Sequence, residues 1–403
     1  MAEGVRRPAR GAVPGRRGSL VGRRASDREL YLDNLKVVLI AAVIAIHGVL
    51  SYAGGLDVWW YTEVRETSLS AVTENAMLVV VGPFGLLLIP LLFLVAGLLT
   101  TPSLARKGAK AFVRDRLLRL GLPFVAYVVL VQPPVVYALE HRLGVAPRSY
   151  LHEFLGEPAQ IDLGPLWFVG VLLIFSLVYA GWVATRRHRT TRRAAHRITF
   201  GRLLLVAAAV APVTAGVRLM FRIGDEGLVS GLNFWEWPAC AALFAVGVVG
   251  SRAGWLERVP VRLVRQCRAA TLLAAGGLVV VMAGGAALGV IDGVEWRGGP
   301  SWVAIVFAAL GSPLTVLGPV WLLGAAQRQL DRRLPYAGPA AARSAYGAFI
   351  VQVVVLIGLA VALRPVPLPA EVKALLVASG GVAGSFAIAW LLITRVPGLW
   401  RVL

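Results

Sequence analysis

The sequence has few charged residues and few cysteines. Only 15% of its 403 residues are Asp, Glu, Lys or Arg, 58% are hydrophobic, and its mean hydropathy is +0.73. A water-soluble domain needs more polar side chains than this to cover its surface. Cys240 and Cys267 form no CxxC pair and have no histidine close in sequence, so they indicate neither a disulfide framework nor a metal site. We therefore expect a membrane protein without a metal.

Long apolar runs recur from residue 35 to residue 394. A helix needs about 20 apolar residues to cross roughly 30 Å of hydrocarbon, where only a helix satisfies its own backbone hydrogen bonds. The sequence thus predicts an all-α fold, a polytopic transmembrane bundle in a single domain over residues 30–403. The ten segments that qualify as spans are 35–53, 79–100, 117–137, 163–184, 202–219, 235–251, 271–291, 301–324, 343–363 and 372–394.

Residues 1–29 differ from the rest, because they are rich in Arg, Gly, Pro and Ala and contain almost no large apolar side chain. Such a segment cannot bury enough surface to fold alone, so we expect a disordered basic tail in the cytoplasm. The first apolar run has the length of a span and is followed by further spans. This predicts an uncleaved first helix rather than a signal peptide.

The net charge of +20 comes from 41 Lys and Arg against 21 Asp and Glu. A basic protein can bind nucleic acid, but here the basic residues stand at the ends of apolar runs and in alternate loops instead of on one soluble face. The intervening loops lean acidic. Because positive loops stay in the cytoplasm during insertion, the alternation predicts both chain ends in the cytoplasm. We expect a multi-pass protein of the plasma membrane, surrounded by lipid, with no nucleic-acid partner.

His47 is the only one of the five histidines that falls within a predicted span. An ionisable side chain there is costly unless it is paired or hydrated, so it is a functional candidate. Lys36 precedes it by eleven residues, which places His47 about 16 Å further along the helix and in the outward half of the membrane. A packing histidine hydrogen-bonded to a neighbouring helix accounts for His47 equally well.

Arg116 and Arg119 enter the third span from its cytoplasmic side. Three residues apart on a helix, they share a face and can hold phosphate groups through their forked donors. The alternative is a pair of snorkelling anchors that only sets the topology, and the residues alone favour that alternative.

Five segments in chain order resemble the membrane-bound acyltransferase-3 family, which includes bacterial polysaccharide O-acetylases. Each segment is weakly specific alone, and the ordered set is more specific because it covers most of the chain. The segments are Leu32-Asp33-Asn34-Leu35-Lys36 running to His47, Pro90-Leu-Leu-Phe93-Leu-Val-Ala-Gly97-Leu98, Arg116-x-x-Arg119, Leu166-Trp167-Phe168 and Ser344-Ala-Tyr346-Gly-Ala-Phe349.

The resemblance implies an O-acyltransferase that moves an acyl group from cytoplasmic acyl-CoA, most simply acetyl-CoA, to a hydroxyl of an outward-facing acceptor such as a glycan. It implies that His47 is the catalytic base and that Arg116 and Arg119 hold the acyl-CoA. Lys36 stands where the family has an arginine, so the charge is kept but the planar fork is lost. Gln352 stands where many members have a histidine, and an amide cannot take a proton.

In this mechanism a neutral imidazole, with an ordinary pKa of about 6.5, takes the hydroxyl proton as the oxygen attacks the thioester. Glu236 and Asp162, at outer helix ends, are conceivable carboxylates to orient the ring, and the sequence selects neither. We expect Trp167, near the outer face, to be an interfacial anchor.

Two other functions stay open. A transporter would show broken helices, and Pro212 and Pro313 lie within spans. A structural relative of the acyltransferases that has lost activity is consistent with the departures at Lys36 and Gln352.

Overall fold

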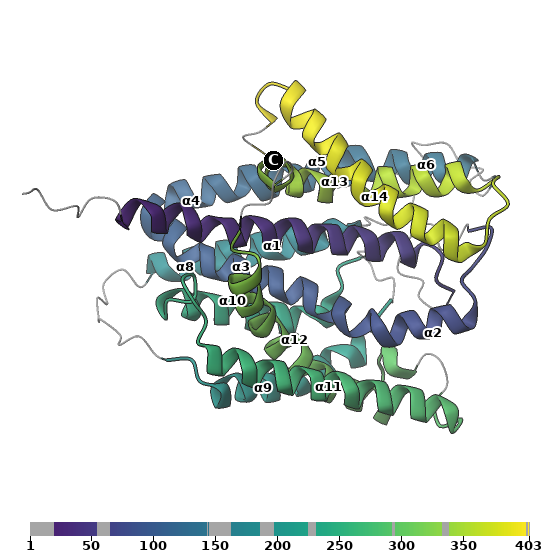
Figure 1. Cartoon of the computed structure of the whole chain (residues 1–403), viewed down its shortest axis with the longest axis horizontal. Coiled ribbons are helices and arrows are strands. Elements are labelled where there is room, and N and C mark those ends of the chain that lie inside the picture. The colour runs from purple at the N-terminus through teal and green to yellow at the C-terminus, as the bar shows by residue number, and fades with distance from the viewer. Residues whose placement is uncertain are drawn as a thin grey trace, which may run out of the picture.

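The computed structural model describes residues 20–54, 65–142, 144, 163–185, 197–224, 231–291, 295–332, 338–399 and 402. Within these ranges the regular elements are all helical (Figure 1). Residues 1–19 of the expected basic tail, and Asp162, lie outside the described residues. Helix α1 begins at Leu20, before the first expected span.

Ten helical segments in the described ranges are long and apolar enough to cross a membrane, which confirms the predicted fold class. Each expected span overlaps one of them. The segments are Leu30–Leu50, Ala71–Lys107, Ala109–Leu139, Gly164–Thr185, Phe200–Met220, Phe234–Arg252, Val261–Ala287, Trp302–Gln329, Gly338–Leu363 and Ala370–Arg395.

Several of these spans are built from more than one helical element. The elements used below are α1 (Leu20–Leu50), α2 (Ala71–Val80), α3 (Gly82–Lys107), α4 (Ala109–Arg116), α5 (Leu122–Ala126), α6 (Gln132–Arg142), α8 (Trp167–Thr185), α9 (Phe200–Met220), α10 (Trp237–Arg252), α11 (Val261–Ala287), α12 (Trp302–Gln329), α13 (Gly338–Leu363) and α14 (Ala370–Arg395). Two π-helical turns, η2 (Leu117–Gly121) and η3 (Tyr127–Val131), interrupt the third span, which the sequence had predicted as one regular helix.

Helix α11, which forms the seventh span, begins at Val261, ten residues before the predicted start of that span at 271. Its first three turns are amphipathic. Arg262, Arg265 and Arg268 are exposed, while Leu263 and Cys267 are buried against the bundle. The average hydropathy of this stretch is lowered by its arginines, so a test for apolar runs places the start of the helix too late.

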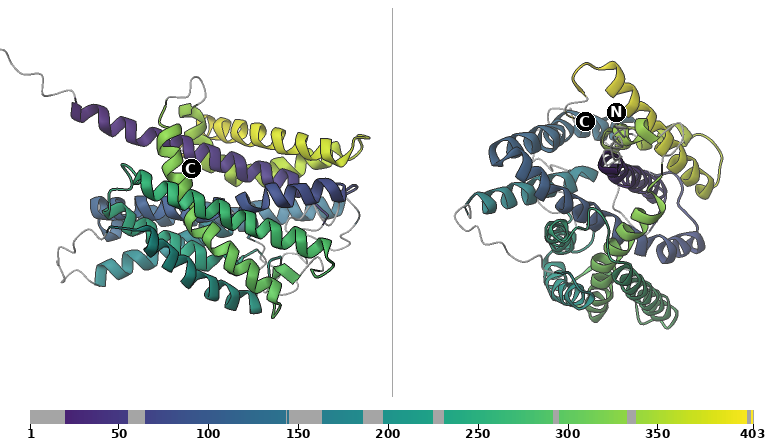
Figure 2. Two further views of the ribbon diagram at one scale, coloured as in Figure 1. Left: turned by 60° about the horizontal axis from the view of Figure 1, so that its bottom comes forward. Right: turned by 60° about the vertical axis from the view of Figure 1, so that its left-hand side comes forward.

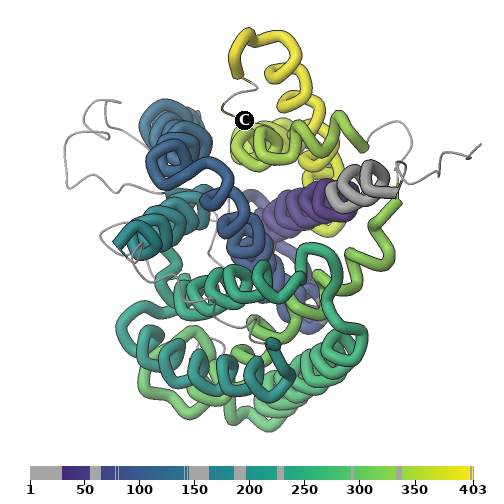
Figure 3. Tube along the Cα trace, turned by 90° about the vertical axis from the view of Figure 1, so that its left-hand side faces the viewer, coloured from purple at the N-terminus to yellow at the C-terminus, as the bar shows by residue number. Residues whose placement is uncertain are grey.

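The helices form a bundle in which α1, α13 and α14 make one side and α9, α11 and α12 the other, with α3 and α10 between them (Figures 2 and 3). Basic residues gather where α3, α10 and α12 end, among them Lys107, Arg252 and Arg328. We call this the arginine-rich end. The opposite end, called the acidic end, holds Glu74 and Glu371.

Helices α3 and α10 make the closest backbone contact through facing glycines. A Cβ atom at Gly97 would collide with the carbonyl oxygen of Phe244, and one at Gly247 would collide with that of Leu94. Contacts between small residues let helix backbones approach and replace the hydrophobic drive that is missing in lipid. This contact fixes the centre of the bundle, against which the outer helices pack.

Gly97→Ala is expected to lower the stability of the folded protein, because the added methyl meets backbone that cannot rotate away; overpacking of this kind costs roughly 1–3 kcal/mol. Gly276→Ala on α11 is the matched control, since nothing lies within 4 Å of the new methyl, and alanine is the better helix former. Thermal unfolding in one detergent should show a lower Tm for Gly97→Ala only. Equal Tm values for the two variants would contradict the close-contact interpretation.

Candidate functional site

His47 lies in the last turn of α1, near the acidic end of the bundle. Its side chain is only partly buried, while its Nδ1 atom is 3.0 Å from Oε1 of Gln352 on α13. The next residue, Gly48, lets α1 approach α14, since a Cβ there would come within 2.7 Å of the Ala378 Cα. Because its hydrogen-bond partner Gln352 is fully buried, the ring of His47 faces the interior of the bundle.

The amide of Gln352 is held in one orientation by a second hydrogen bond. Gln352 is fully buried, and its Nε2 atom donates to the carbonyl oxygen of Phe349 at 2.9 Å. Its Oε1 atom therefore faces His47 and can only accept a hydrogen bond. Nδ1 of His47 must carry the proton that it donates, which places the basic lone pair on Nε2, the tautomer assigned by this hydrogen-bond network.

Two further segments that suggested the family, those with Phe168 and Phe349, meet beside this pair. The ring of Phe349 packs edge to face against Phe168 at the start of α8, with ring centroids 4.8 Å apart. Trp167 is 6% exposed and belongs to the buried core, so the expectation of an interfacial anchor was wrong. Its position inside the bundle follows from the 3-10 turn Gly164–Leu166, which leads α8 in with its first residues buried.

Arg116 and Arg119 stand at the arginine-rich end of the third span, and their environments differ. The Cζ atom of Arg116 lies 5.0 Å from the centroid of the Phe112 ring. Arg119 is more exposed and its Nε atom is 3.3 Å from Oδ1 of Asp115, whose Oδ2 atom is 2.8 Å from Nζ of Lys107. Arg119 belongs to a π-helical turn, so the pair does not have the α-helical spacing that the sequence predicted.

Asp115 is a site residue that the sequence analysis did not identify. It forms ion pairs with Lys107 from the end of α3 and with Arg119, and it thereby joins these two basic side chains into one cluster beside Arg116. The arrangement offers several forked or ammonium donors at one end of the bundle, as an anionic phosphate requires.

Lys36 shares helix α1 with His47, and the structure does not bring the two side chains together. Eleven residues amount to about three turns plus 20°, so both point to the same side of the helix about 16 Å apart. The Nζ atom of Lys36 is 2.7 Å from Oδ1 of Asp33, and both side chains are nearly half exposed. This positive charge therefore lies toward the arginine-rich end.

Glu236, considered above as an orienting carboxylate, lines a separate pocket with Arg218. The partner that the structure gives to Nδ1 of His47 is the amide of Gln352. The sequence had indicated only that Gln352 departs from the family. In the described ranges no three His, Cys, Asp or Glu side chains come together in a way that could hold a metal ion.

The ten membrane-length helical segments of the described ranges define the class of this protein, a multi-pass membrane protein. The chain belongs to the acyltransferase-3 family, because the family model described as "Acyltransferase domain" matches residues 29–394, nearly its whole length. It is a membrane acyltransferase. Neither a curated protein nor a solved structure matches the chain.

Proposed function

We propose that this protein is an O-acyltransferase of the plasma membrane, which transfers an acyl group, in the simplest case acetyl, from cytoplasmic acyl-CoA to a hydroxyl of an outward-facing glycan. One observation carries the proposal. His47 donates a hydrogen bond from Nδ1 to Gln352 inside a membrane bundle, and this bond supports a base role because a neutral imidazole held in this way has Nε2 as its basic atom.

The proton inventory follows from that tautomer. Nε2 takes the proton of the acceptor hydroxyl while the oxygen forms its bond to the thioester carbonyl carbon. The imidazolium then returns this proton to the sulfur as the carbon–sulfur bond breaks, and the ring is neutral again. During the positive stage the Nδ1–H hydrogen bond to Gln352 is charge-assisted and therefore stronger. Gln352 acts as a positioning residue and moves no proton.

The basic cluster supports a phosphate-bearing donor at the other end of the bundle. The positive-inside rule predicts that the arginine-rich end faces the cytoplasm, where acyl-CoA is made available. Arg116, Arg119 and Lys36 provide the charge for its phosphate groups. Asp115 keeps Lys107 and Arg119 in place. Both basic side chains are accessible enough to exchange this carboxylate for a phosphate group.

The direct test uses the purified full-length protein in liposomes with acetyl-CoA labelled in the acetyl group. Label should appear in base-labile esters when membranes or surface glycans from the source cells are added, and it should stay in acetyl-CoA when they are omitted. A comparison of surface glycans from cells with and without the protein should show the loss of one ester. Uptake or export of solutes by liposomes without acyl-CoA, with no transfer of label, would refute the proposal in favour of a transporter.

The double variant Arg116→Gln/Arg119→Gln is expected to raise KM for acyl-CoA by roughly 10-fold to 100-fold, because charge-assisted hydrogen bonds to phosphate are lost. The kcat value should change much less, since the reacting atoms are at His47. Lys110→Gln, exposed on the same helix α4, removes one charge outside the cluster and serves as the control. An unchanged KM in the double variant would show that Arg116 and Arg119 do not bind acyl-CoA and only set the topology.

A further inference from the structure

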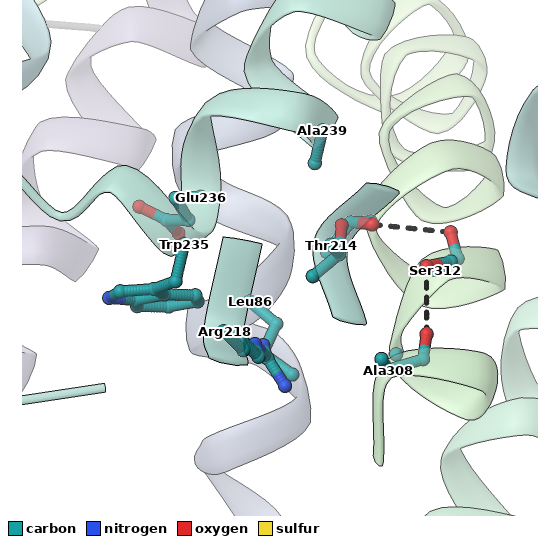
Figure 4. Close-up of a pocket in the computed structure, with 10 residues that line it drawn as sticks. Leu86, Thr214, Arg218, Trp235, Glu236, Ala239, Ala308 and Ser312 are labelled. Atoms are coloured by element: carbon teal, nitrogen blue, oxygen red, sulfur yellow. Dashed lines mark hydrogen bonds between the residues drawn. The ribbon is translucent and has the colours of Figure 1, made fainter. Parts of the chain in front are cut away.

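A second polar pocket lies between α9, α10 and α12, on helices other than α1 and α13, which carry His47 and Gln352. Ten residues line it, and Figure 4 shows Glu236 and Trp235 on one side, Ser312 and Ala308 on the other, and Thr214 and Arg218 between them. Arg218 belongs to the last turn of α9 and Glu236 directly precedes α10. The pocket is therefore close to the acidic end.

Arg218 is the unusual residue of this pocket. It is 4% exposed, and in the part of the chain that the structure describes its Nε and Nη1 atoms have no hydrogen-bond partner. Its Cζ atom lies 5.3 Å from the Trp235 ring centroid and 4.9 Å from that of Phe307. The two rings stabilise the charge, but they cannot accept the forked N–H groups in the plane of the guanidinium.

Local contacts fix the backbone at Arg218 and the ring of Trp235. The carbonyl oxygen of Arg218 accepts a hydrogen bond from the amide of Gly299 at 3.0 Å. Gly298 must be glycine, because its φ is +154° and a Cβ would lie 2.6 Å from that same carbonyl oxygen. Asn233, in the left-handed region with a φ of +46°, begins the turn that presents Trp235, and its Oδ1 atom accepts from Nε1 of Trp235 at 3.2 Å.

The other polar groups of the pocket include both donors and acceptors. Thr214, one turn before Arg218, has a buried hydroxyl without a partner in the described ranges. Glu236 is 6% exposed and lines the same pocket. Ser312 uses its hydroxyl proton on the carbonyl oxygen of Ala308 at 2.7 Å, which leaves its oxygen as an acceptor. Buried donors and acceptors of this kind are costly unless a further group satisfies them.

The charges of the pocket favour a neutral group as its occupant. Arg218 and Glu236 line the same cavity, so an anion attracted by the guanidinium would lie beside a carboxyl group, which repels an anion whenever it is ionised. A hydroxyl fits both, because its oxygen accepts from Arg218 and its proton is donated to Glu236. The cavity of about 20 Å³ has room for one such group.

We propose that this pocket binds one hydroxyl group of a carbohydrate at the acidic end of the bundle, as a subsite apart from His47. The choice of a carbohydrate rests on the glycan acceptor proposed above, whereas the need for a hydroxyl follows from the pocket alone. A long acceptor chain held here would be anchored by a part of the molecule that does not react.

The test measures binding without acyl-CoA, so its result does not depend on catalysis. Full-length protein in nanodiscs is heated with methyl glucoside, methyl galactoside or methyl mannoside, and with sodium acetate or sodium chloride. At least one glycoside should raise the Tm in a saturable way. Thr214→Val should weaken the apparent affinity roughly fivefold to tenfold, the effect of one lost hydrogen bond. Arg218→Lys, which keeps the charge but loses the fork, should abolish the response.

Two controls localise the effect. Arg202→Gln, exposed at the other end of α9, should respond like the wild type, and so should His47→Asn. A Tm rise with acetate or chloride alone, dependent on Arg218, would overturn the proposal in favour of an anion site. No response to any of the three glycosides would overturn it too, because the cavity would then hold only water. Glycoside binding in a protein that transfers no acyl group would leave this subsite intact and refute the proposed function instead.

Discussion

His47→Ala is expected to reduce acyl transfer by about 10²-fold to 10⁴-fold, the contribution of a general base, while the protein remains inserted and folded. The reason is that Nε2 is the atom that we propose takes the hydroxyl proton, and alanine has no basic atom in its place. The measurement is transfer of labelled acetyl to the acceptor at saturating acetyl-CoA, together with the Tm of each variant. The loss should appear in kcat, because the ring does not hold the phosphates of the donor.

His47→Asn makes this experiment sharper than alanine alone. The asparagine amide nitrogen takes the place of Nδ1 and keeps a donor toward Oε1 of Gln352, but it offers no basic atom. It should therefore unfold at nearly the wild-type temperature and be as inactive as His47→Ala. Substantial transfer by a folded His47→Asn protein would show that the histidine has only the packing role considered in the sequence analysis.

Gln352→Leu is expected to lower kcat by roughly 10-fold to 100-fold, by analogy with the loss of activity when the hydrogen-bond partner of a metal-binding histidine is removed. Leucine has a similar volume but accepts no hydrogen bond, so Nδ1 is no longer held as the donor and the ring can adopt the wrong tautomer. The KM for acyl-CoA should change little. Steady-state kinetics over a range of acyl-CoA concentrations separates the two parameters.

Two further glutamine variants distinguish positioning from stability. Gln352→Glu keeps an oxygen acceptor at the same length and should recover much of the activity lost in Gln352→Leu. Gln327→Leu makes the same chemical change elsewhere, where the glutamine bonds the carbonyl oxygen of Trp255 and the amide of Val259. It should lower the Tm without a specific loss of kcat. If Gln352→Leu also changed only the Tm, the positioning role would be wrong.

The ten spans were predictable because hydrophobic length is a local property that each segment carries by itself. The start of α11 and the π-helical turns were not, since arginines on one face and changes of backbone winding leave no mark on an average hydropathy. The place of His47 within a membrane-length helix was also predictable, whereas its role as a base stays a prediction.

The partner of His47 was beyond the reach of sequence reasoning. Gln352 lies 305 residues further along the chain, and one sequence does not reveal which residues of two distant helices meet. Its identity was noted only as a departure from the family, whereas its packing makes it the group that sets the ring. Arg218 was missed for a different reason. It falls one residue before the end of the predicted span 202–219, where a basic residue is usually a solvated anchor.

The two π-helical turns of the third span rotate α6 relative to α4 compared with a continuous α-helix. A π turn closes its hydrogen bonds over five residues instead of four, so each one inserts about one residue relative to an α-helix. One residue corresponds to a rotation of about 100°. Arg116 therefore points in a different direction relative to the side chains of α6 than a continuous α-helix would give it. The direction of the arginines at the start of this span is therefore set by the rotation that the π-helical turns add, and it cannot be read from the apolar pattern of the whole span.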